Sequence, residues 1–148
     1  MQKLPSTFRQ TWLRFLIAIA ALNLVWEAGQ MPLYTLWQTG TPWEITYAIL
    51  HCTIGDILIA AVSLATALKV FGATVWPDKR YGLVAGAAMV IAVGYTLFSE
   101  WWNVEIRQAW AYRDIMPRLP GIGTGLSPVM QWLFVPALAF WLVWPRSG

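Results

Sequence analysis

The sequence has little charge: Asp, Glu, Lys and Arg make up only 11% of its 148 residues. Soluble domains carry about 25%, so the composition argues against a soluble globular domain. A single cysteine excludes an internal disulfide, and a single histidine leaves none of the paired ligands typical of zinc sites. The net charge of +3 is spread over flanks and loops rather than gathered in one patch, which argues against a nucleic-acid partner.

Apolar side chains, by contrast, are abundant. Hydrophobic residues make up 58% of the chain, and the mean hydropathy is +0.54. The 11 tryptophans fit a membrane protein, because indoles favour the membrane–water interface. We therefore expect residues 1–148 to form one bilayer-embedded domain.

Four apolar runs reach the roughly 17–25 residues that a helix needs to cross a bilayer. They cover about residues 12–37, 47–71, 81–102 and 128–144. Backbone polar groups must be paired within lipid, so these runs predict helices rather than open strands. The sequence therefore predicts an all-α integral membrane protein, a four-transmembrane-helix bundle. A long loop, residues 103–127, precedes the last helix, and loops of this length are often functional.

Basic residues predict the orientation, because cytoplasmic flanks are enriched in Lys and Arg. One side would carry seven of them: Lys3, Arg9, Arg14, Lys69, Lys79, Arg80 and Arg146. The other side would carry three: Arg107, Arg113 and Arg118. We therefore expect both termini to be cytoplasmic. The basic start resembles a signal peptide, but no small-residue cleavage site follows it, so we expect a retained first helix. A bacterial inner membrane is the expected location.

Polar residues interrupt the first apolar run at helical spacing. Asn23, Glu27, Gln30 and Tyr34 are separated by 4, 3 and 4 positions, which places them on one helix face. Trp26 lies beside this face. With the predicted topology, these residues lie in the outer half of the bilayer.

The other three runs place polar residues at the same level. The second has His51 and Asp56, about 140° apart around a helix, so that they would flank a site. The third ends with Glu100 and Asn103, and the fourth begins with Gln131 and Trp132. We expect these side chains to line a polar chamber covered by the long loop. Ionisable residues at such depth are costly and often functional.

The simpler interpretations remain open. Asn23, Gln30 and Gln131 could join helices by hydrogen bonds, Asp56 could pair with an Arg or Tyr, and His51 and Glu100 could be solvated at the interface. A copper site built from His51, Cys52, Met31 and Met116 is a weaker alternative, because these residues are scattered along the chain. We expect no resident metal or cofactor.

Carboxyl groups in a low-dielectric site can divide the roles of proton donor and base. Glu27, Glu100 and Asp56, with His51, are therefore the candidate catalytic residues. The candidate substrate-binding residues are Asn23, Trp26, Gln30, Tyr34, Asn103, Gln131 and Trp132.

Three short stretches resemble the EXPERA-domain group, the emopamil-binding sterol isomerases and their relatives. The stretch 23–27 is similar to the group's H-L-V-I-E. "GYTLFSE" ends in Ser99-Glu100 where the group's third helix has Tyr and Leu followed by Thr-Glu. Met130-Gln131-Trp132 precedes Pro136, with a shorter spacing, as the group's M-N-A-L-W precedes a proline. The resemblance implies that Glu27 and Glu100 act as acid and base, and that Trp26 or Trp132 stabilises a carbocation. Asn23 replaces the group's histidine, and the long loop has no counterpart, so a shared fold need not imply the isomerase reaction.

The sequence thus predicts a protein that binds a hydrophobic small molecule or lipid, sterol-like or isoprenoid, in a polar pocket. It could be an isomerase-type proton-transfer enzyme. The alternative is an accessory subunit or small transporter with an intramembrane proton or ion relay. A homodimer is compatible with either function.

Overall fold

The computed structural model describes residues 6–72 and 74–144, and this part is helical apart from turns and two isolated β-bridges. Four helices are long and apolar enough to cross a membrane. They are α1 (Ser6–Gln30), α3 (Pro42–Phe71), α4 (Tyr81–Trp101) and α5 (Leu126–Val143). The predicted all-α bundle with four helices of transmembrane length is confirmed.

The predicted bounds of the first helix were wrong at both ends. The helix begins at Ser6, continues to Gln30, and is followed by the 3₁₀ turn η1 (Met31–Leu33) and the short helix α2 (Leu36–Thr39). Pro32 lies at the start of η1. Its ring cannot donate a backbone hydrogen bond and clashes with the preceding turn, which ends the α-helix there.

α3 begins five residues earlier than predicted because its first turn is capped. The Thr41 hydroxyl accepts the Glu44 N–H at 3.3 Å, and the Glu44 carboxylate accepts the Thr41 N–H at 2.7 Å. This reciprocal capping box satisfies two backbone donors at the helix start. The predicted loop 103–127 is also shorter than expected, because the π-helix η2 (Trp102–Ile106) extends α4 and α5 starts at Leu126.

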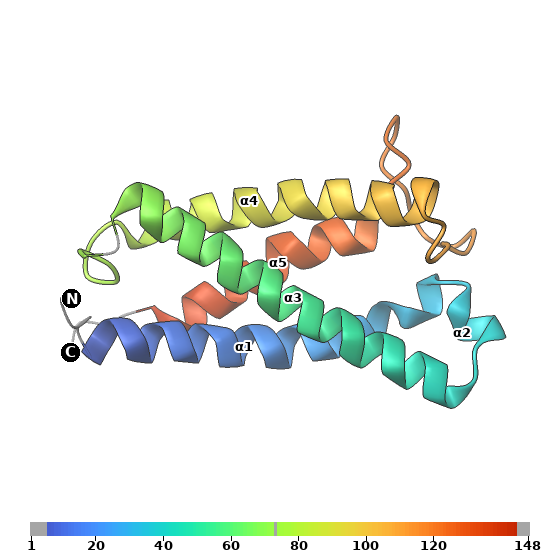
Figure 1. Cartoon of the computed structure of the whole chain (residues 1–148), viewed down its shortest axis with the longest axis horizontal. Helices are drawn as coiled ribbons and strands as arrows, with labels where there is room; N and C mark the ends of the chain where they lie inside the picture. The colour runs from blue at the N-terminus through green and yellow to red at the C-terminus, as the bar shows by residue number, and fades with distance from the viewer. Residues whose placement is uncertain (1–5, 73, 145–148) are drawn as a thin grey trace.

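Neighbouring helices pack in the order α1, α3, α4, α5 and back to α1 around the bundle (Figure 1). α1 begins and α5 ends at the same end of the molecule, which we call the termini end. α2 and the segment between η2 and α5 lie at the opposite end, the α2 end.

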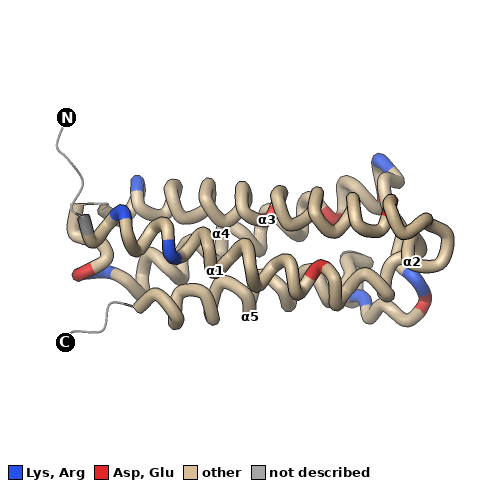
Figure 2. Tube along the Cα trace, turned by 90° about the horizontal axis from the view of Figure 1, so that it is seen from below, with Lys and Arg blue, Asp and Glu red and all other residues tan. Residues whose placement is uncertain are grey.

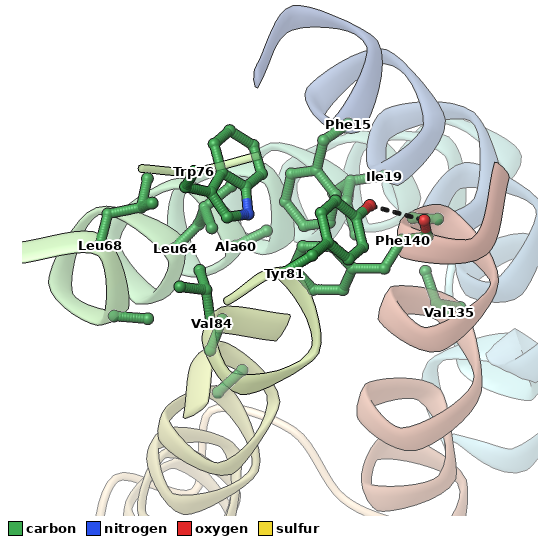
Figure 3. Packing of buried hydrophobic residues seen from close by; sticks show 14 of the residues in the cluster. Phe15, Ile19, Ala60, Leu64, Leu68, Trp76, Tyr81, Val84, Val135 and Phe140 are labelled. Carbon is green, nitrogen blue, oxygen red and sulfur yellow. Dashed lines mark hydrogen bonds between the residues drawn. The ribbon is translucent and has the colours of Figure 1, made fainter. Parts of the chain in front are cut away.

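The termini end contains the apolar core (Figure 3). Phe15, Ile19, Leu64 and Val84 are fully buried there, and the rings of Phe15 and Phe140 stack at 4.3 Å. The Tyr81 hydroxyl donates a 2.7 Å hydrogen bond to the backbone oxygen of Phe140. This oxygen belongs to the last turn of α5, where carbonyls have no partner within the helix, so the bond ties α4 to the end of α5.

Candidate functional site

The buried face of every long helix is mainly apolar toward the termini end, where Thr11 and Ser63 are the buried polar exceptions among the described residues, and becomes polar toward the α2 end. On α1 the change falls between Ile19 and Asn23, which are one turn apart. The polar residues buried beyond this level on the four helices are Asn23, Glu27, Gln30, Thr53, Asp56, Thr96, Glu100 and Gln131. The predicted convergence of polar side chains from all four helices at one level is therefore present in the fold.

Gln131 is the centre of this cluster. Its Nε2 lies 2.8 Å from Asn23 Oδ1, 2.8 Å from Glu27 Oε1 and 2.9 Å from Asp56 Oδ2. One amide group on α5 therefore contacts α1 beside it and α3 across the bundle. A primary amide has only two N–H bonds, so these three oxygens share two hydrogens.

Gln30 forms a second layer around Glu27. Its Nε2 donates to Glu27 Oε1 at 2.8 Å and to Gln131 Oε1 at 3.3 Å. Its own oxygen accepts the Trp26 indole N–H at 3.3 Å and the Ser127 hydroxyl at 2.8 Å. Gln30 and Gln131 thus act as interhelical hydrogen-bonding residues, which was the simpler interpretation, and both also hold the Glu27 carboxyl group.

Glu27 and Asp56 form a carboxyl pair. Each lies under 3 Å from the same Gln131 nitrogen, and their carboxyl groups are within hydrogen-bonding reach of each other. In residues 6–72 and 74–144, no Lys or Arg contributes a compensating charge to either group. Two negative charges this close in a medium of low dielectric constant repel each other strongly. A shared proton relieves this repulsion.

The amide nitrogen of Asn23 adds an unused donor to the same cluster. Asn23 is 1% exposed, and within the described part of the chain its Nδ2 has no hydrogen-bond partner. Its oxygen is occupied by Gln131. The cluster therefore combines a carboxyl pair with a buried N–H₂ group that is free to bind an acceptor.

Glu100 lies apart from the pair and has its own partner. The Tyr112 hydroxyl, from the segment between η2 and α5, donates a hydrogen bond to the Glu100 carboxylate. Burial, together with the nearby Glu100 charge, raises the pKa of Tyr112. The charges of Glu27 and Asp56 lie close enough to interact electrostatically with Glu100. Glu100 therefore lies between the pair and the covering loop.

The covering loop is fastened to the end of α1. Tyr34 and Tyr112 form an isolated β-bridge, in which the Thr35 N–H donates to Ala111 O at 3.0 Å. Arg113 donates its Nη1–H to Pro32 O at 2.7 Å. The rings of Tyr34 and Tyr112 lie 5.5 Å apart, and burial raises the pKa of Tyr34. Beyond this anchor the loop continues as a hairpin that projects from the α2 end (Figure 1).

Three candidate residues lie elsewhere than expected. His51 does not face the cluster: its side chain is exposed on α3, and its ring stacks on Tyr47 at 5.6 Å. Since His51 and Asp56 are about 140° apart, the rotation of α3 that buries Asp56 turns His51 outward. Asn103 bonds within its own turn, to Ser99 O at 2.8 Å. Trp132 is buried in the apolar core cluster.

Residues of the alternative metal site are not gathered either. His51 is exposed on α3, while Met31 and Met116 are buried on η1 and in the covering loop. In the described ranges no three His, Cys, Asp or Glu side chains are close enough to hold a metal ion.

Besides Thr53 and Thr96, the sequence did not predict Tyr112 as a residue of this site. It lies in an irregular segment, where no helical period relates its position to Glu100. The only signal available was an aromatic hydroxyl in a long loop, which is too common to select one residue.

Comparisons with protein-family models, with curated proteins and with solved structures found no match to this chain. The three stretches that resemble the EXPERA-domain group nevertheless lie at one end of the bundle, since Glu27 and Gln131 are in direct contact and Glu100 is near them. The resemblance remains a prediction.

Proposed function

We propose that this multi-pass membrane protein takes up and releases a proton at the Glu27–Asp56 pair, acting on a hydrophobic small molecule or lipid. The observation that carries the proposal is the contact of both carboxyl groups with the single Gln131 nitrogen, with no described Lys or Arg to neutralise them. A pair that holds one proton contains both a donor and a base. It is therefore suited to isomerase-type chemistry, in which a proton is added at one carbon and removed at another.

The surroundings of the pair indicate the class of substrate. The pair lies within helices of transmembrane length, so a molecule that reaches it from the bilayer must be largely apolar. The unpartnered Asn23 Nδ2 would hold a hydroxyl or carbonyl oxygen on that molecule. A sterol-like or isoprenoid alcohol or ketone fits both requirements, and the resemblance to the EXPERA-domain group supports the same class.

The charge distribution supports a cytoplasmic position for both termini. Lys and Arg lie toward the two ends of the bundle (Figure 2). The termini end carries five described basic residues, namely Arg9, Arg14, Lys69, Lys79 and Arg80, and the other end carries Arg107, Arg113 and Arg118. Lys3 and Arg146, which entered the sequence prediction, lie outside the described residues. Under the positive-inside rule, the carboxyl pair then lies in the outer half of the membrane, for which a bacterial inner membrane is our proposal.

A second candidate function is a proton relay in an accessory subunit or small transporter. The hydrogen bond between Tyr112 and Glu100 favours it, because it extends the series of ionisable groups from the pair to the covering loop. A relay needs no apolar ligand, which distinguishes it from the enzyme.

Native mass spectrometry in mild detergent tests the first function. We expect wild-type protein to retain one apolar molecule, and Glu27→Gln to lose it or to accumulate an unconverted form. Glu105→Gln, an exposed carboxyl replacement on η2, is the matched control and should behave as wild type. Bulk phospholipid alone in all three proteins would contradict the enzyme proposal.

Infrared difference spectra between acidic and alkaline buffer test the shared proton. A protonated carboxyl band that disappears in both Glu27→Gln and Asp56→Asn, but stays in Glu105→Gln, would support a proton held by the pair. A band unchanged in the two pair variants would contradict both candidate functions.

A further inference from the structure

A groove of about 880 Å³ lies between α1 and α3 at the termini end, far along the helices from the carboxyl pair. α1 contributes Phe8, Arg9, Gln10, Trp12 and Leu13, and α3 contributes Ala65, Leu68 and Lys69. The two helices are antiparallel, so the start of α1 meets the end of α3 here. Five of its eight lining residues are exposed, so the groove opens on the outer surface of the bundle, near the ends of two helices of transmembrane length.

The groove is charged at its outer end and apolar farther in. Lys69 is the last groove residue on α3, and Arg9 follows Phe8 near the start of α1. Both cationic side chains are exposed. Neither has a hydrogen bond or an ion pair with any other residue of the described chain, whereas Arg80 at the same end is bound to Phe71 O at 2.9 Å. The two cations therefore line one groove with no counter-ion among residues 6–72 and 74–144.

Apart from the two cations and Gln10, the groove is lined by apolar side chains. The Phe8 and Trp12 rings stack at 6.1 Å along α1, and Leu68 is buried below them on α3. Ala65, one turn farther into the membrane from Lys69, has a small exposed side chain that leaves the groove open. Leu13, which is exposed to the bilayer, continues the apolar wall on α1.

We propose that this groove is a binding site for one anionic phospholipid. Its phosphate would lie between Arg9 and Lys69, and one acyl chain would lie along Trp12, Leu13 and Ala65. The charge complementarity commits the site to an anionic head group, since basic residues near the bilayer surface attract anionic lipids. Trp12 and Leu13 lie about one turn deeper along α1 than Arg9, and Ala65 lies one turn deeper along α3 than Lys69. This matches the order of charged head group and acyl chain in such a lipid.

The test uses the full-length protein, depleted of lipid and titrated with phosphatidylglycerol or phosphatidylcholine in detergent, with the bound lipids counted by native mass spectrometry. We expect one phosphatidylglycerol to bind more tightly than phosphatidylcholine. Removing each basic residue should weaken that binding about fivefold, so that Arg9→Gln with Lys69→Gln should weaken it roughly thirtyfold.

Two further variants distinguish lipid binding in the groove from a general attraction to the positive charge of this end. Arg14→Gln with Lys79→Gln removes the same net charge at the same end, outside the groove, and should leave the tightest binding step unchanged. Ala65→Trp keeps both cations but fills the groove, and should abolish the preference for the first lipid; since Ala65 is exposed, its replacement need not disturb folding, which the circular dichroism spectrum checks.

Three results would overturn the proposal. Equal loss in the two charge variants would show a response to net charge alone. Unchanged first-lipid binding in Ala65→Trp would show that the groove is not the site. A wild-type dimer that Ala65→Trp dissociates would show that a second copy of the chain, rather than a lipid, covers this surface.

Discussion

The two ends of the same four helices bury mainly opposite kinds of side chain. Along α1 the buried face presents Phe15 and Ile19 toward the termini end, and then Asn23 and Glu27 toward the α2 end. The apolar end is held by ring and aliphatic packing, whereas the polar end is held by a network centred on Gln131.

This difference shows how the bundle combines adhesion with a fixed register. In lipid, apolar side chains gain only better packing when helices associate, because the acyl chains are as apolar as they are. A shift of α5 by one turn, 5.4 Å, would keep much of that packing but would separate Gln131 from the carboxyl pair. The polar end therefore selects one register, and this selection is what places the proton-binding groups together.

Breaking the centre of the polar end should have the largest effect. Gln131→Met keeps the side-chain length but removes the donor shared by Asn23, Glu27 and Asp56. We expect a loss of about 3 kcal/mol of unfolding free energy, since buried polar groups are left without a partner. Unfolding in mixed micelles with increasing dodecyl sulfate measures it.

The double variant Gln131→Met with Glu27→Gln is the control for that prediction. The new amide at position 27 can donate to Asp56, so part of the lost stability should return. If the losses of unfolding free energy from the two substitutions were simply additive, Gln131 would not stabilise the protein through the carboxyl pair.

Disrupting the apolar end should cost somewhat less. Phe15→Ala leaves a cavity where the ring stacks on Phe140. The same change in a water-soluble core costs about 3–5 kcal/mol, part of which is transfer from water. Lipid does not supply that part, so we expect about 2 kcal/mol in the same unfolding assay. Leu13→Ala, at a site that is 59% exposed on the same helix, should cost little, and an equal cost at both sites would refute the assignment of the core.

Tyr81→Phe tests the buried hydrogen bond between α4 and α5 at the apolar end. It removes the hydrogen bond to Phe140 O while keeping the ring, so we expect a loss of about 1 kcal/mol. Tyr95→Phe, on the exposed face of α4, is the matched control. An effect of the same size in both would mean that the hydrogen bond does not stabilise the helix end.

The smallest change in stability should come from Tyr112, which covers the polar end, and it should appear only at alkaline pH. Burial and the Glu100 charge raise the pKa of Tyr112 above its ordinary value of 10.0. The unfolded chain then releases the proton first, so stability is fully present below pH 10 and falls as the pH rises above it. At a pH of about 10.5, the loss of unfolding free energy that is due to Tyr112 should not exceed about 0.8 kcal/mol.

Unfolding measured across this pH range in wild type and Tyr112→Phe checks the prediction. The variant should lose less stability over the interval, although its stability at neutral pH falls because Glu100 loses its partner. Tyr47→Phe, an exposed replacement on α3, should follow the wild-type curve. Parallel curves for all three proteins would place Tyr112 outside the buried cluster.

The sequence could predict the helices and the level of the polar residues, but not all of their neighbours. The spacing of Asn23, Glu27 and Gln30 identified one face of α1, and the structure buries that face. For His51 and Asp56 the helical angle of about 140° led us to expect that both would flank the site, whereas only Asp56 is buried there and His51 is exposed. Which of the two turns inward depends on how α3 packs against α1 and α4. The helical period of α3 contains no information about that packing.

The sequence by itself determined that this chain forms four long apolar helices, because backbone groups in lipid must be bonded within their own segment. The sequence also determined that one face of each helix changes from apolar to polar. Helical spacing is a local property, so it shows which residues share a face and where along that face the polar ones begin. Only the tertiary structure decided that Gln131 joins Asn23, Glu27 and Asp56, that Tyr112 covers Glu100, and that His51 lies outside. These contacts join residues 12 to 108 positions apart in the chain, and no local period relates positions on different helices or in a loop.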